Sequence, residues 1–245
     1  MTASSLFGSD EGTDEGSDAT SAEPQPPSSS QGLDGRRTLP PPPDPSSTPT
    51  TRTAPGGLYH FPHAIPIELQ TLLVQNITTA LPLSMNQNQL MYFKHLPPAL
   101  DPLLSHLEAE LATYNLPTEI LDDLMGHPNS DRQAIINLYG PGMGIAPHVD
   151  LPHRYSSVIL GVSLLGTTVM DFVLTDDPGK RFEMVIRPGD VYVLSGQSRY
   201  VWTHGIELRH SDWIDGEERK RGLRISVTLR RMKEGGHVVG AESAT

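Results

Sequence analysis

Apolar residues in the first half of the folded part of the chain recur at helical spacing. A proline, Pro66, precedes the first such series, which predicts a helix with proline in or just before its first turn. A second helix is predicted from Pro102 to the Leu116-Pro117 pair, with Asp101 as its N-cap. A short third helix is predicted from Thr118 to Met125. The apolar positions of the first two helices are Ile67, Leu69, Leu72, Leu73, Ile77 and Leu81, then Leu103, Leu104, Leu107 and Leu111.

From Ala134 onward the pattern changes to short apolar or alternating runs separated by Gly, Pro and Asp, which is typical of strands and turns. Seven strands are predicted, at Ala134–Tyr139, Val158–Leu165, Val169–Leu174, Phe182–Ile186, Asp190–Leu194, Val201–Leu208 and Arg224–Arg230. Because the helices come first and the strands second, the chain is expected to be α+β rather than alternating α/β. Seven short strands of this kind predict a sandwich or barrel with the helices packed outside it.

Composition separates an N-terminal arm from this folded region. Ten of the 23 prolines fall in residues 1–56, where Ser, Thr, Gly and Asp fill most other positions. Such a segment buries too little apolar surface to offset its ordering entropy, so residues 1–57 are expected to form a disordered acidic arm. One domain is expected over residues 58–233, followed by a flexible tail at 234–245. The absence of cysteine excludes a disulfide-stapled scaffold, a thiolate nucleophile and an iron–sulfur cluster.

The net charge of −11 is unevenly distributed. Residues 1–56 carry eight acids and three arginines, and residues 57–131 carry eight acids and one base, Lys94. Residues 132–245 are nearly balanced, and a basic footprint for nucleic acid is expected only there, in Arg219, Lys220, Arg221, Arg230, Arg231 and Lys233. No apolar run is long enough to span a membrane, and the acidic N-terminus is unlike a targeting peptide, so a cytoplasmic or nuclear location is expected.

Three residues form a candidate metal site. His148 and Asp150 are two positions apart, which puts both side chains on one face of an extended segment. His204 follows 56 residues later, within Trp202-Thr203-His204-Gly205. Two histidines and a carboxylate are the facial triad of non-haem Fe(II) oxygenases, in which three metal positions stay open. A zinc hydrolase can use the same residues, so this alternative stays open.

The last predicted strand alternates strictly, with Arg224, Ser226, Thr228 and Arg230 on one face and apolar residues on the other. Arg224 and Arg230 are six positions apart, so their Cα atoms lie roughly 20 Å from each other. If both side chains, each about 6 Å long, lean toward each other, a gap of about 8 Å remains between their guanidinium groups. A five-carbon dicarboxylate fills such a gap, and arginine holds carboxylates through paired hydrogen bonds. Asn137 and Tyr139 also share a strand face and are candidates for the same ligand. The alternative is an ordinary amphipathic strand whose arginines face solvent.

Taken together, these residues resemble the AlkB family of Fe(II)/2-oxoglutarate dioxygenases, and the oxygenase domain of its tRNA-modifying homologue most of all. The resemblance rests on Asn137-Leu138-Tyr139, Pro141-Gly142, His148-Val149-Asp150, Ser163-Leu164, Val169-Met170-Asp171-Phe172, Ser198-Arg199-Tyr200-Val201-Trp202-Thr203-His204-Gly205, Arg221-Gly222-Leu223-Arg224 and Arg230. It implies a double-stranded β-helix, or jelly-roll, core at residues 134–233 behind a helical, lid-forming part at 58–133.

The resemblance also implies a role for each site residue. His148, Asp150 and His204 would bind Fe(II), and Arg224 would hold the distal carboxylate of 2-oxoglutarate. Arg230 would lie by the iron-proximal carboxylate, while Asn137 and Tyr139 would complete the pocket. Arg199 is expected to support the site without binding a ligand.

The substrate stays open at this stage. The implied reaction uses 2-oxoglutarate and molecular oxygen to hydroxylate or oxidatively demethylate a substrate. The family favours a modified base in RNA or DNA, and Tyr92 and Phe93 are candidates to stack on it. The acidic residues of the expected lid would repel a phosphate backbone, which favours a protein or small-molecule substrate instead. A non-catalytic jelly-roll binding module is the further alternative.

Overall fold

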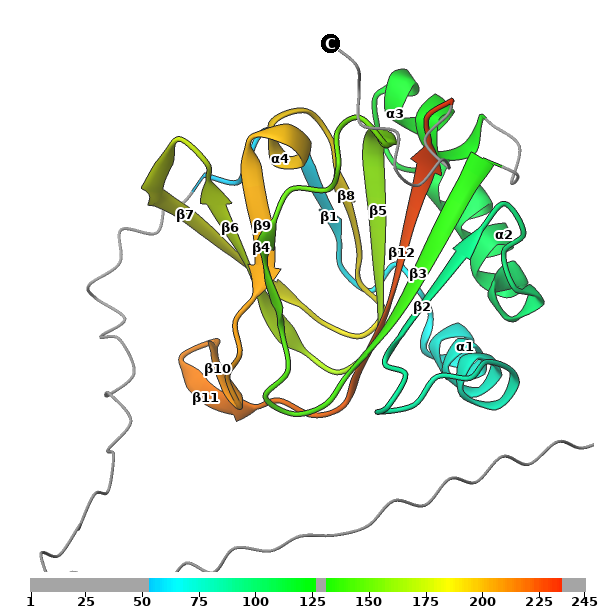
Figure 1. The fold of residues 1–245 in the computed structure, drawn as a ribbon, viewed down its shortest axis with the longest axis horizontal. Helices are drawn as coiled ribbons and strands as arrows, with labels where there is room; N and C mark the ends of the chain where they lie inside the picture. Colours follow the sequence, from blue (N-terminus) through cyan, green and yellow to red (C-terminus); the bar gives the residue numbers. More distant parts are fainter. Residues whose placement is uncertain (1–52, 127–130, 235–245) are drawn as a thin grey trace, which may run out of the picture. The chain divides into compact units, whose positions relative to one another are not determined.

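The structure, a computed structural model, describes residues 53–126 and 131–234 (Figure 1). The expected arm therefore lies outside the described residues up to residue 52, and so does the expected tail from residue 235. None of the helices within the described ranges is long and apolar enough to cross a membrane.

All three helices predicted from apolar spacing are present, as α1 (Ile67–Ala80), α2 (Asp101–Leu111) and α3 (Thr118–Met125). The predicted N-cap of α2 is wrong. A 3-10 turn, η1 (Pro98–Leu100), runs directly into α2, so Leu100 is the N-cap and Asp101 is already the first helical residue. No side chain caps this helix, because Asp101 lacks the extended backbone that a capping residue needs. Its carboxylate lies instead in the first turn, where the helix dipole favours negative charge.

The seven predicted strands are also present, although their ends differ by a few residues. They are β3 (Arg132–Tyr139), β5 (Tyr155–Leu165), β6 (Thr168–Leu174), β7 (Asp177–Ile186), β8 (Val191–Leu194), β9 (Trp202–Ile206) and β12 (Arg224–Met232). Six further short elements were not predicted, because four or five residues are too few to establish a periodicity. They are β1 (Leu58–Phe61), β2 (Gln89–Phe93), β4 (Ile145–His148), α4 (Gly196–Tyr200), β10 (Ser211–Ile214) and β11 (Glu217–Lys220).

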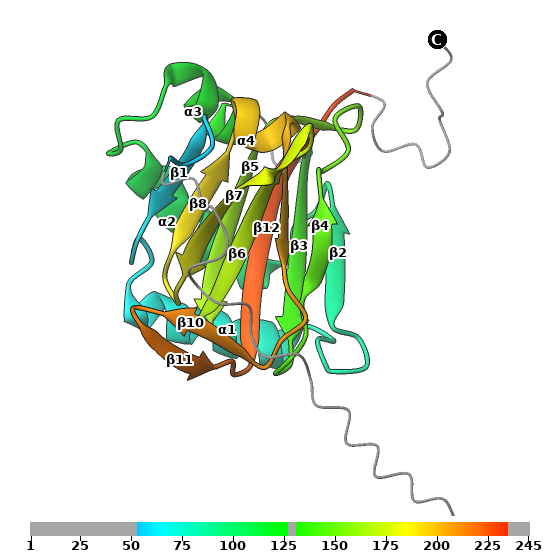
Figure 2. The same cartoon turned by 90° about the vertical axis from the view of Figure 1, so that its left-hand side faces the viewer.

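Within the described residues the strands form two main sheets, and every strand pair is antiparallel. One sheet has six strands in the order β1-β8-β5-β12-β3-β2, and the other has four in the order β4-β9-β6-β7. Figures 1 and 2 show the two sheets facing each other, with β12 near the middle of the larger one. This arrangement is a jelly roll, as predicted.

The helices cover the outer face of the six-stranded sheet (Figure 1). Their leucines and isoleucines form one core with the apolar side chains of β3, β5, β8 and β12, among them Ile225, Val227 and Leu229. The alternating residues of β12, Arg224, Ser226, Thr228 and Arg230, line a cavity on the opposite face. A second core lies between the two sheets and includes Phe172, Ile186 and Trp202. The alternation of β12 therefore sorts its residues into a helix-packed face and a cavity face, as predicted.

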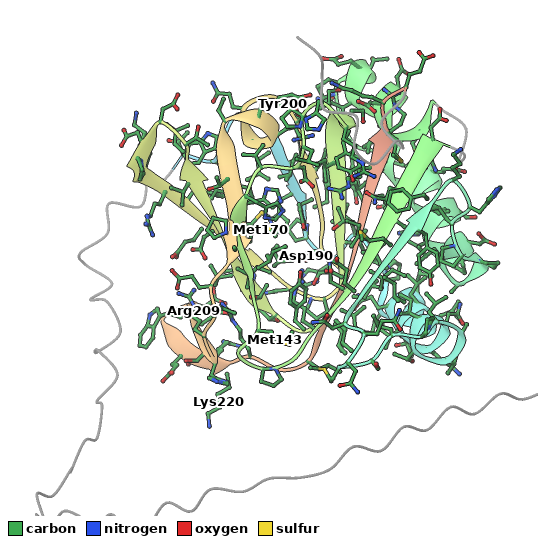
Figure 3. All side chains as sticks on the ribbon, viewed as in Figure 1. Met143, Met170, Asp190, Tyr200, Arg209 and Lys220 are labelled. Atoms are coloured by element: carbon green, nitrogen blue, oxygen red, sulfur yellow. The ribbon has the colours of Figure 1, made fainter. Side chains whose placement is uncertain are left out.

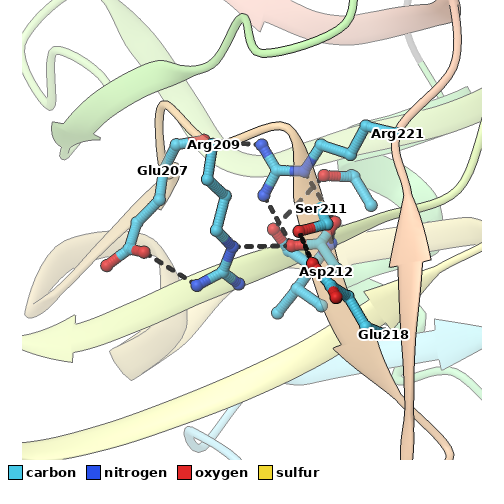
Figure 4. Close-up of polar contacts among 8 residues, drawn as sticks. Glu207, Arg209, Ser211, Asp212, Glu218 and Arg221 are labelled. Atoms are coloured by element: carbon cyan, nitrogen blue, oxygen red, sulfur yellow. Dashed lines mark hydrogen bonds and ion pairs between the residues drawn. The ribbon is translucent and has the colours of Figure 1, made fainter. Parts of the chain in front are cut away.

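The hairpin of β10 and β11 is held by a network of ion pairs (Figure 4). The buried carboxylate of Asp212 accepts bonds from Arg221 Nε and Nη2 at 2.6 and 2.7 Å, and from Arg209 Nε at 2.8 Å. Arg209 also pairs with Glu207 at 2.7 Å. The predicted basic footprint is therefore not a surface patch, because Arg221 is buried in this network and Arg231 pairs with Asp123 at 3.0 Å. Only Arg219, Lys220 and Lys233 of that group are exposed.

Candidate active site

The three predicted metal ligands meet between two neighbouring strands of the smaller sheet. β4 pairs with β9, and the register sets His148 opposite His204. Asp150 follows β4 by two residues and its Oδ2 lies 3.5 Å from His204 Nε2. The ligand atoms of the three side chains all lie within 4.8 Å of one another. The antiparallel pairing of β4 with β9 thus brings distant sequence positions to one point.

The protonation and orientation of these side chains suit a metal ion. His148 Nδ1 lies 2.9 Å from the carbonyl oxygen of Ala146, to which it donates as the protonated nitrogen, so Nε2 keeps a free lone pair. Burial lowers the pKa of His204 to about 4, although Asp150 partly offsets this effect. His204 is therefore neutral at physiological pH, the form in which imidazole binds metals. Two imidazoles and one carboxylate fit Fe(II) with three coordination positions open.

Two buried arginines fix the third ligand, Asp150. Arg230 Nη1 donates to Asp150 Oδ1, which leaves Oδ2 directed toward His204. Arg199, which is only 2% exposed, donates from Nη1 to the Asp150 carbonyl oxygen at 2.7 Å. One arginine therefore orients the carboxylate and the other fixes the backbone that carries it.

A cavity of about 440 Å³ extends from the triad along the inner face of the larger sheet. All seven predicted site residues line it: Asn137, Tyr139, His148, Asp150, His204, Arg224 and Arg230. Met170, labelled in Figure 3, lines the same cavity between the two sheets. The structure thus gathers every predicted ligand in one place, while the individual roles of these residues stay predictions.

Arg224, at one end of β12, is a buried cation without an acidic partner. The residue is 5% exposed, and its guanidinium carbon lies 5.2 Å from the centre of the Tyr139 ring. Tyr139 is the residue opposite Arg224 on the adjacent strand β3. Among the described residues no carboxylate pairs with it, and its Nε has no hydrogen-bond acceptor. Burial lowers the pKa of Arg224, an effect that Tyr139 and Tyr192 partly offset. A buried guanidinium with an unsatisfied donor beside a cavity is suited to bind an anion, and a carboxylate matches its paired donors.

Further polar side chains surround the space between Arg224 and the triad. Gln89 Nε2 donates to Asn137 Oδ1 at 2.8 Å, which orients the Asn137 amide. Tyr192 is buried, and burial raises its pKa to about 12, so its phenol stays protonated and can donate a hydrogen bond. Arg230, at the other end of β12, also donates from Nε to Gln133 Oε1 at 2.6 Å. Arg230 therefore lies at the triad end of the cavity and Arg224 at the far end.

Sequence reasoning missed three of these residues as part of the site. Tyr192 belongs to a predicted strand, and its alternation with Asp190 and Leu194 was a usable signal. Gln89 lies on β2, for which the sequence gives no clear periodicity. Tyr155, whose ring lies 3.6 Å from the Arg230 guanidinium, precedes the predicted start of its strand. Arg199 was expected to support the site, and its bond to Asp150 agrees with that role.

A comparison with protein families supports the same reading. The model of the 2OG-Fe(II) oxygenase superfamily matches residues 58–230. The chain belongs to this superfamily. Its cofactors, Fe(II) and 2-oxoglutarate, are those that the donor set and the unpaired arginine fit. This 2OG-Fe(II) oxygenase also has relatives among the AlkB homologues, which confirms the resemblance seen in the sequence.

Three relatives illustrate the range of similarity to this 2OG-Fe(II) oxygenase. An uncharacterized protein, L905, of Acanthamoeba polyphaga mimivirus is 38% identical over 100 residues, 41% of this chain and 48% of the viral protein. The mitochondrial alpha-ketoglutarate-dependent dioxygenase alkB homolog 7 of Bos taurus is 45% identical over 92 residues, 37% of this chain and 41% of its own. The tRNA (carboxymethyluridine(34)-5-O)-methyltransferase ALKBH8 of Macaca fascicularis is 34% identical over 118 residues, 42% of this chain and 18% of its own. The chain thus spans less than half the length of each.

Proposed function

We propose that the protein is an Fe(II)- and 2-oxoglutarate-dependent dioxygenase that hydroxylates, or oxidatively demethylates, a modified base in nucleic acid. The observation that carries the proposal is the pairing of two features in one cavity. A His-Asp-His cluster lies at one end, and Arg224, a buried arginine without an acidic partner in the described part of the chain, lies at the other. A zinc hydrolase does not need the buried arginine, and a non-catalytic binding module does not need the His-Asp-His cluster.

The residues of the chain have distinct tasks in this reaction. His148, Asp150 and His204 would hold Fe(II), which with 2-oxoglutarate and oxygen supplies hydroxylation of a C–H bond, with succinate and carbon dioxide as by-products. Arg224 would bind the distal carboxylate of 2-oxoglutarate, and Tyr192 would donate to the same ligand. Hydroxylation of an N-methyl group yields a product that releases formaldehyde, which accounts for demethylation.

The strength with which Arg224 would bind a carboxylate depends on its burial as well as on its charge. Tyr139 and Tyr192 exclude water from the Arg224 guanidinium, so its bonds to a carboxylate are stronger than they would be at the surface. Arg230 and Arg199 hold Asp150 in place and thereby keep the triad arranged before any ligand binds. The chain's own part is thus to position ligands and to exclude water.

The choice of a nucleic-acid base rests on two supports. The ALKBH8 relative has a name that assigns it to tRNA, and it matches 42% of this chain. The cavity also opens beside exposed apolar side chains of Met91 and Leu151, which suit a flat base. Hydroxylation of a protein or a small molecule is the second candidate, because the alkB homolog 7 relative has the higher identity, 45% against 34%, and its name gives no substrate besides alpha-ketoglutarate.

The test is an activity survey of the purified chain with Fe(II), ascorbate and 2-oxoglutarate. Methylated oligonucleotides, total tRNA and cell extract are offered in turn, with succinate release and product mass as readouts. We expect substrate-dependent succinate release that is lost in the His204→Ala variant. Equal succinate release by wild type and His204→Ala would refute the proposed dioxygenase activity. Modification of a protein in the extract, with no modification of the nucleic acids, would show that the substrate is a protein.

A further inference from the structure

One end of the larger sheet lies above the metal triad and carries a cationic group that the site does not use. The ends of β2 and β12 and the start of β5 meet there, since Met232 lies opposite Tyr155 and Phe93 opposite Gln133. The turn that precedes β5 follows directly from Asp150 and contains Arg154. This turn therefore connects a metal ligand to the rim of the cavity.

Arg154 is held in place by aromatic rings and backbone bonds. Its guanidinium carbon lies 5.8 Å from the centre of the Phe93 ring and 5.7 Å from that of Tyr155. Its carbonyl oxygen accepts a bond from Lys233 N at 3.0 Å, and Lys233 Nζ donates to Pro152 O at 2.8 Å. Two rings and a fixed turn thus orient the Arg154 side chain without neutralising its charge.

The charge of Arg154 has no acidic partner among residues 53–126 and 131–234. Its Nε is buried and has no hydrogen-bond acceptor there. Arg154 lies close to the arginine that binds Asp150, since the guanidinium carbons of Arg154 and Arg230 lie 5.7 and 3.6 Å from the centre of the same Tyr155 ring. A pre-oriented guanidinium with an unsatisfied donor is suited to receive an oxyanion.

The rim beside Arg154 is open and apolar. Met91 is 53% exposed, Leu151 46% and Phe93 37%, and the first two line the cavity that contains the triad. A flat group entering past Met91 and Leu151 would reach the metal site, and a group attached to it would lie near Arg154. Lys233 adds a second exposed cation at the same turn.

We propose that Arg154 is a substrate-positioning residue that binds a phosphate of a single-stranded nucleic acid while the base occupies the cavity. This inference rests on the proposed function and assigns it a contact residue. Phosphate fits better than the carboxylates of an acidic peptide, because a base beside its phosphate matches an apolar opening beside a fixed guanidinium. Arg154 acts by holding the strand and takes no part in the chemistry.

Among the described residues, none of the acids of residues 57–131 lines the cavity. Helices α1, α2 and α3 carry seven of the eight acids of residues 57–131, and these helices cover the face of the larger sheet opposite the cavity. Of the residues in this region that the structure describes, 57–126 and 131, only Gln89 and Met91, both on β2, line the cavity. A phosphate near Arg154 would therefore meet the cations of this turn on the cavity side of the sheet. Asp123 of α3, which bonds to Ser157 behind the turn, is paired with Arg231.

The test measures binding of an eight-residue oligouridine to protein loaded with Mn(II) and 2-oxoglutarate, so that no turnover occurs. Arg154→Gln should weaken binding about tenfold or more, and Arg154→Lys should weaken it less, since lysine keeps the charge but not the fork. The slope of log affinity against log salt should fall by roughly 0.7, the value for one phosphate contact on a single strand. Phe93→Ala, which removes one supporting ring, should also weaken binding.

Matched controls make the result specific. Arg219→Gln removes the same charge at an exposed residue of β11, paired only with Glu217, and should leave affinity nearly unchanged. The proposal is overturned if wild type fails to bind the oligouridine, or if Arg154→Gln binds as tightly as wild type. It is also overturned if Arg219→Gln has the same effect, or if an octaglutamate peptide competes as well as the oligouridine.

A separate readout distinguishes a failure of the Arg154 proposal from a failure of the proposed dioxygenase function. Absorbance of the anaerobic Fe(II)–2-oxoglutarate complex and succinate release without substrate should be the same in Arg154→Gln and wild type, since Arg154 does not line the cavity. If those signals persist while binding is unchanged, only the role of Arg154 is refuted. Loss of those signals in wild type would instead refute the dioxygenase.

Discussion

Substitution of Arg224 separates a co-substrate clamp from a structural arginine. Arg224 is buried, carries no acidic partner among the described residues and has an unsatisfied Nε. The protein without ligand therefore bears the cost of an unpaired buried cation, and 2-oxoglutarate would remove that cost when it binds. Removing one partner of a desolvated charge pair costs about 2–5 kcal/mol, so Arg224→Ala should weaken 2-oxoglutarate binding roughly 30-fold to several-thousand-fold.

Two further variants sharpen the argument. Arg224→Lys should weaken binding less than Arg224→Ala does, because lysine keeps a positive charge but cannot form two parallel bonds. Arg224→Met fills a similar volume without charge, and replacing an unpaired buried ion by an apolar side chain is often neutral or stabilising. The ligand-free Arg224→Met protein should therefore melt at or above the temperature of wild type. The melting temperature of wild type alone should rise strongly with 2-oxoglutarate.

Calorimetric titration with 2-oxoglutarate in the presence of Mn(II), together with thermal melts, decides the matter. Arg231 would have been the natural control from the sequence, since its odd position on β12 turns it away from Arg224. The structure makes Arg219 the better choice, because Arg231 pairs with the buried Asp123 at 3.0 Å and its loss would itself destabilise the fold. Equal 2-oxoglutarate affinity in wild type and Arg224→Ala would refute the clamp.

Three other outcomes are expected. His204→Ala should abolish the visible absorption band of the anaerobic Fe(II)–2-oxoglutarate complex, and a band that persists would exclude this ligand. Gly161→Ala should impair 2-oxoglutarate binding, because the added methyl would overlap the Tyr192 ring and push it into the cavity; titration checks this. Asp212→Asn should destabilise the fold by about 3–5 kcal/mol in urea unfolding, because it breaks a buried ion pair with Arg221. Burial raises the Asp212 pKa, but bonds from Arg221 and Arg209 outweigh it and hold the pKa below its usual range. The wild-type stability from Asp212 is therefore present above about pH 4 and lost as pH falls through the folded-state pKa, and Asp212→Asn should lack that dependence.

Much of the site was predictable because it lies on strands with strict alternation. On β12 a single pattern, charged or hydroxylated residues alternating with Ile225, Val227 and Leu229, gave both the core face and the ligand face. The triad was predictable for a similar reason, since His148 and Asp150 are two residues apart in an extended segment. Local periodicity is sufficient where one face of a strand is buried among helices and the other faces a ligand.

The elements that escaped prediction are those whose environment is set by distant partners. β4 has four residues, and only its pairing with β9 makes it a strand that presents His148 opposite His204. β2 alternates exposed and more buried residues in the structure, but its sequence is apolar after Gln89 and shows no alternation, although Gln89 and Met91 line the cavity. Asp101 was placed as a cap because the sequence does not reveal the 3-10 turn that precedes its helix. In each case the deciding contact joins residues far apart, or depends on backbone geometry that side-chain pattern does not encode.

Charge shows the same limit most clearly, and the consequence concerns substrate choice. Residues 57–131 carry eight acids and one base, and a count alone predicts that this part of the chain repels phosphate. The count is right, but seven of those acids lie on helices that pack against the outer face of the larger sheet. Salt screens exposed charges over about 10 Å, which weakens the effect of the outward-facing acids at the cavity mouth. Asp123 of α3, which bonds to Ser157 at this end of the sheet, is paired with Arg231. The positive charge at the cavity mouth comes from Arg154 and Lys233. Arg154 lies in the turn that follows Asp150, and Lys233, directly after β12, bonds to the backbone of that turn. Net charge therefore excludes little about the substrate, and the position of a few unpaired cations beside the opening is the more informative quantity.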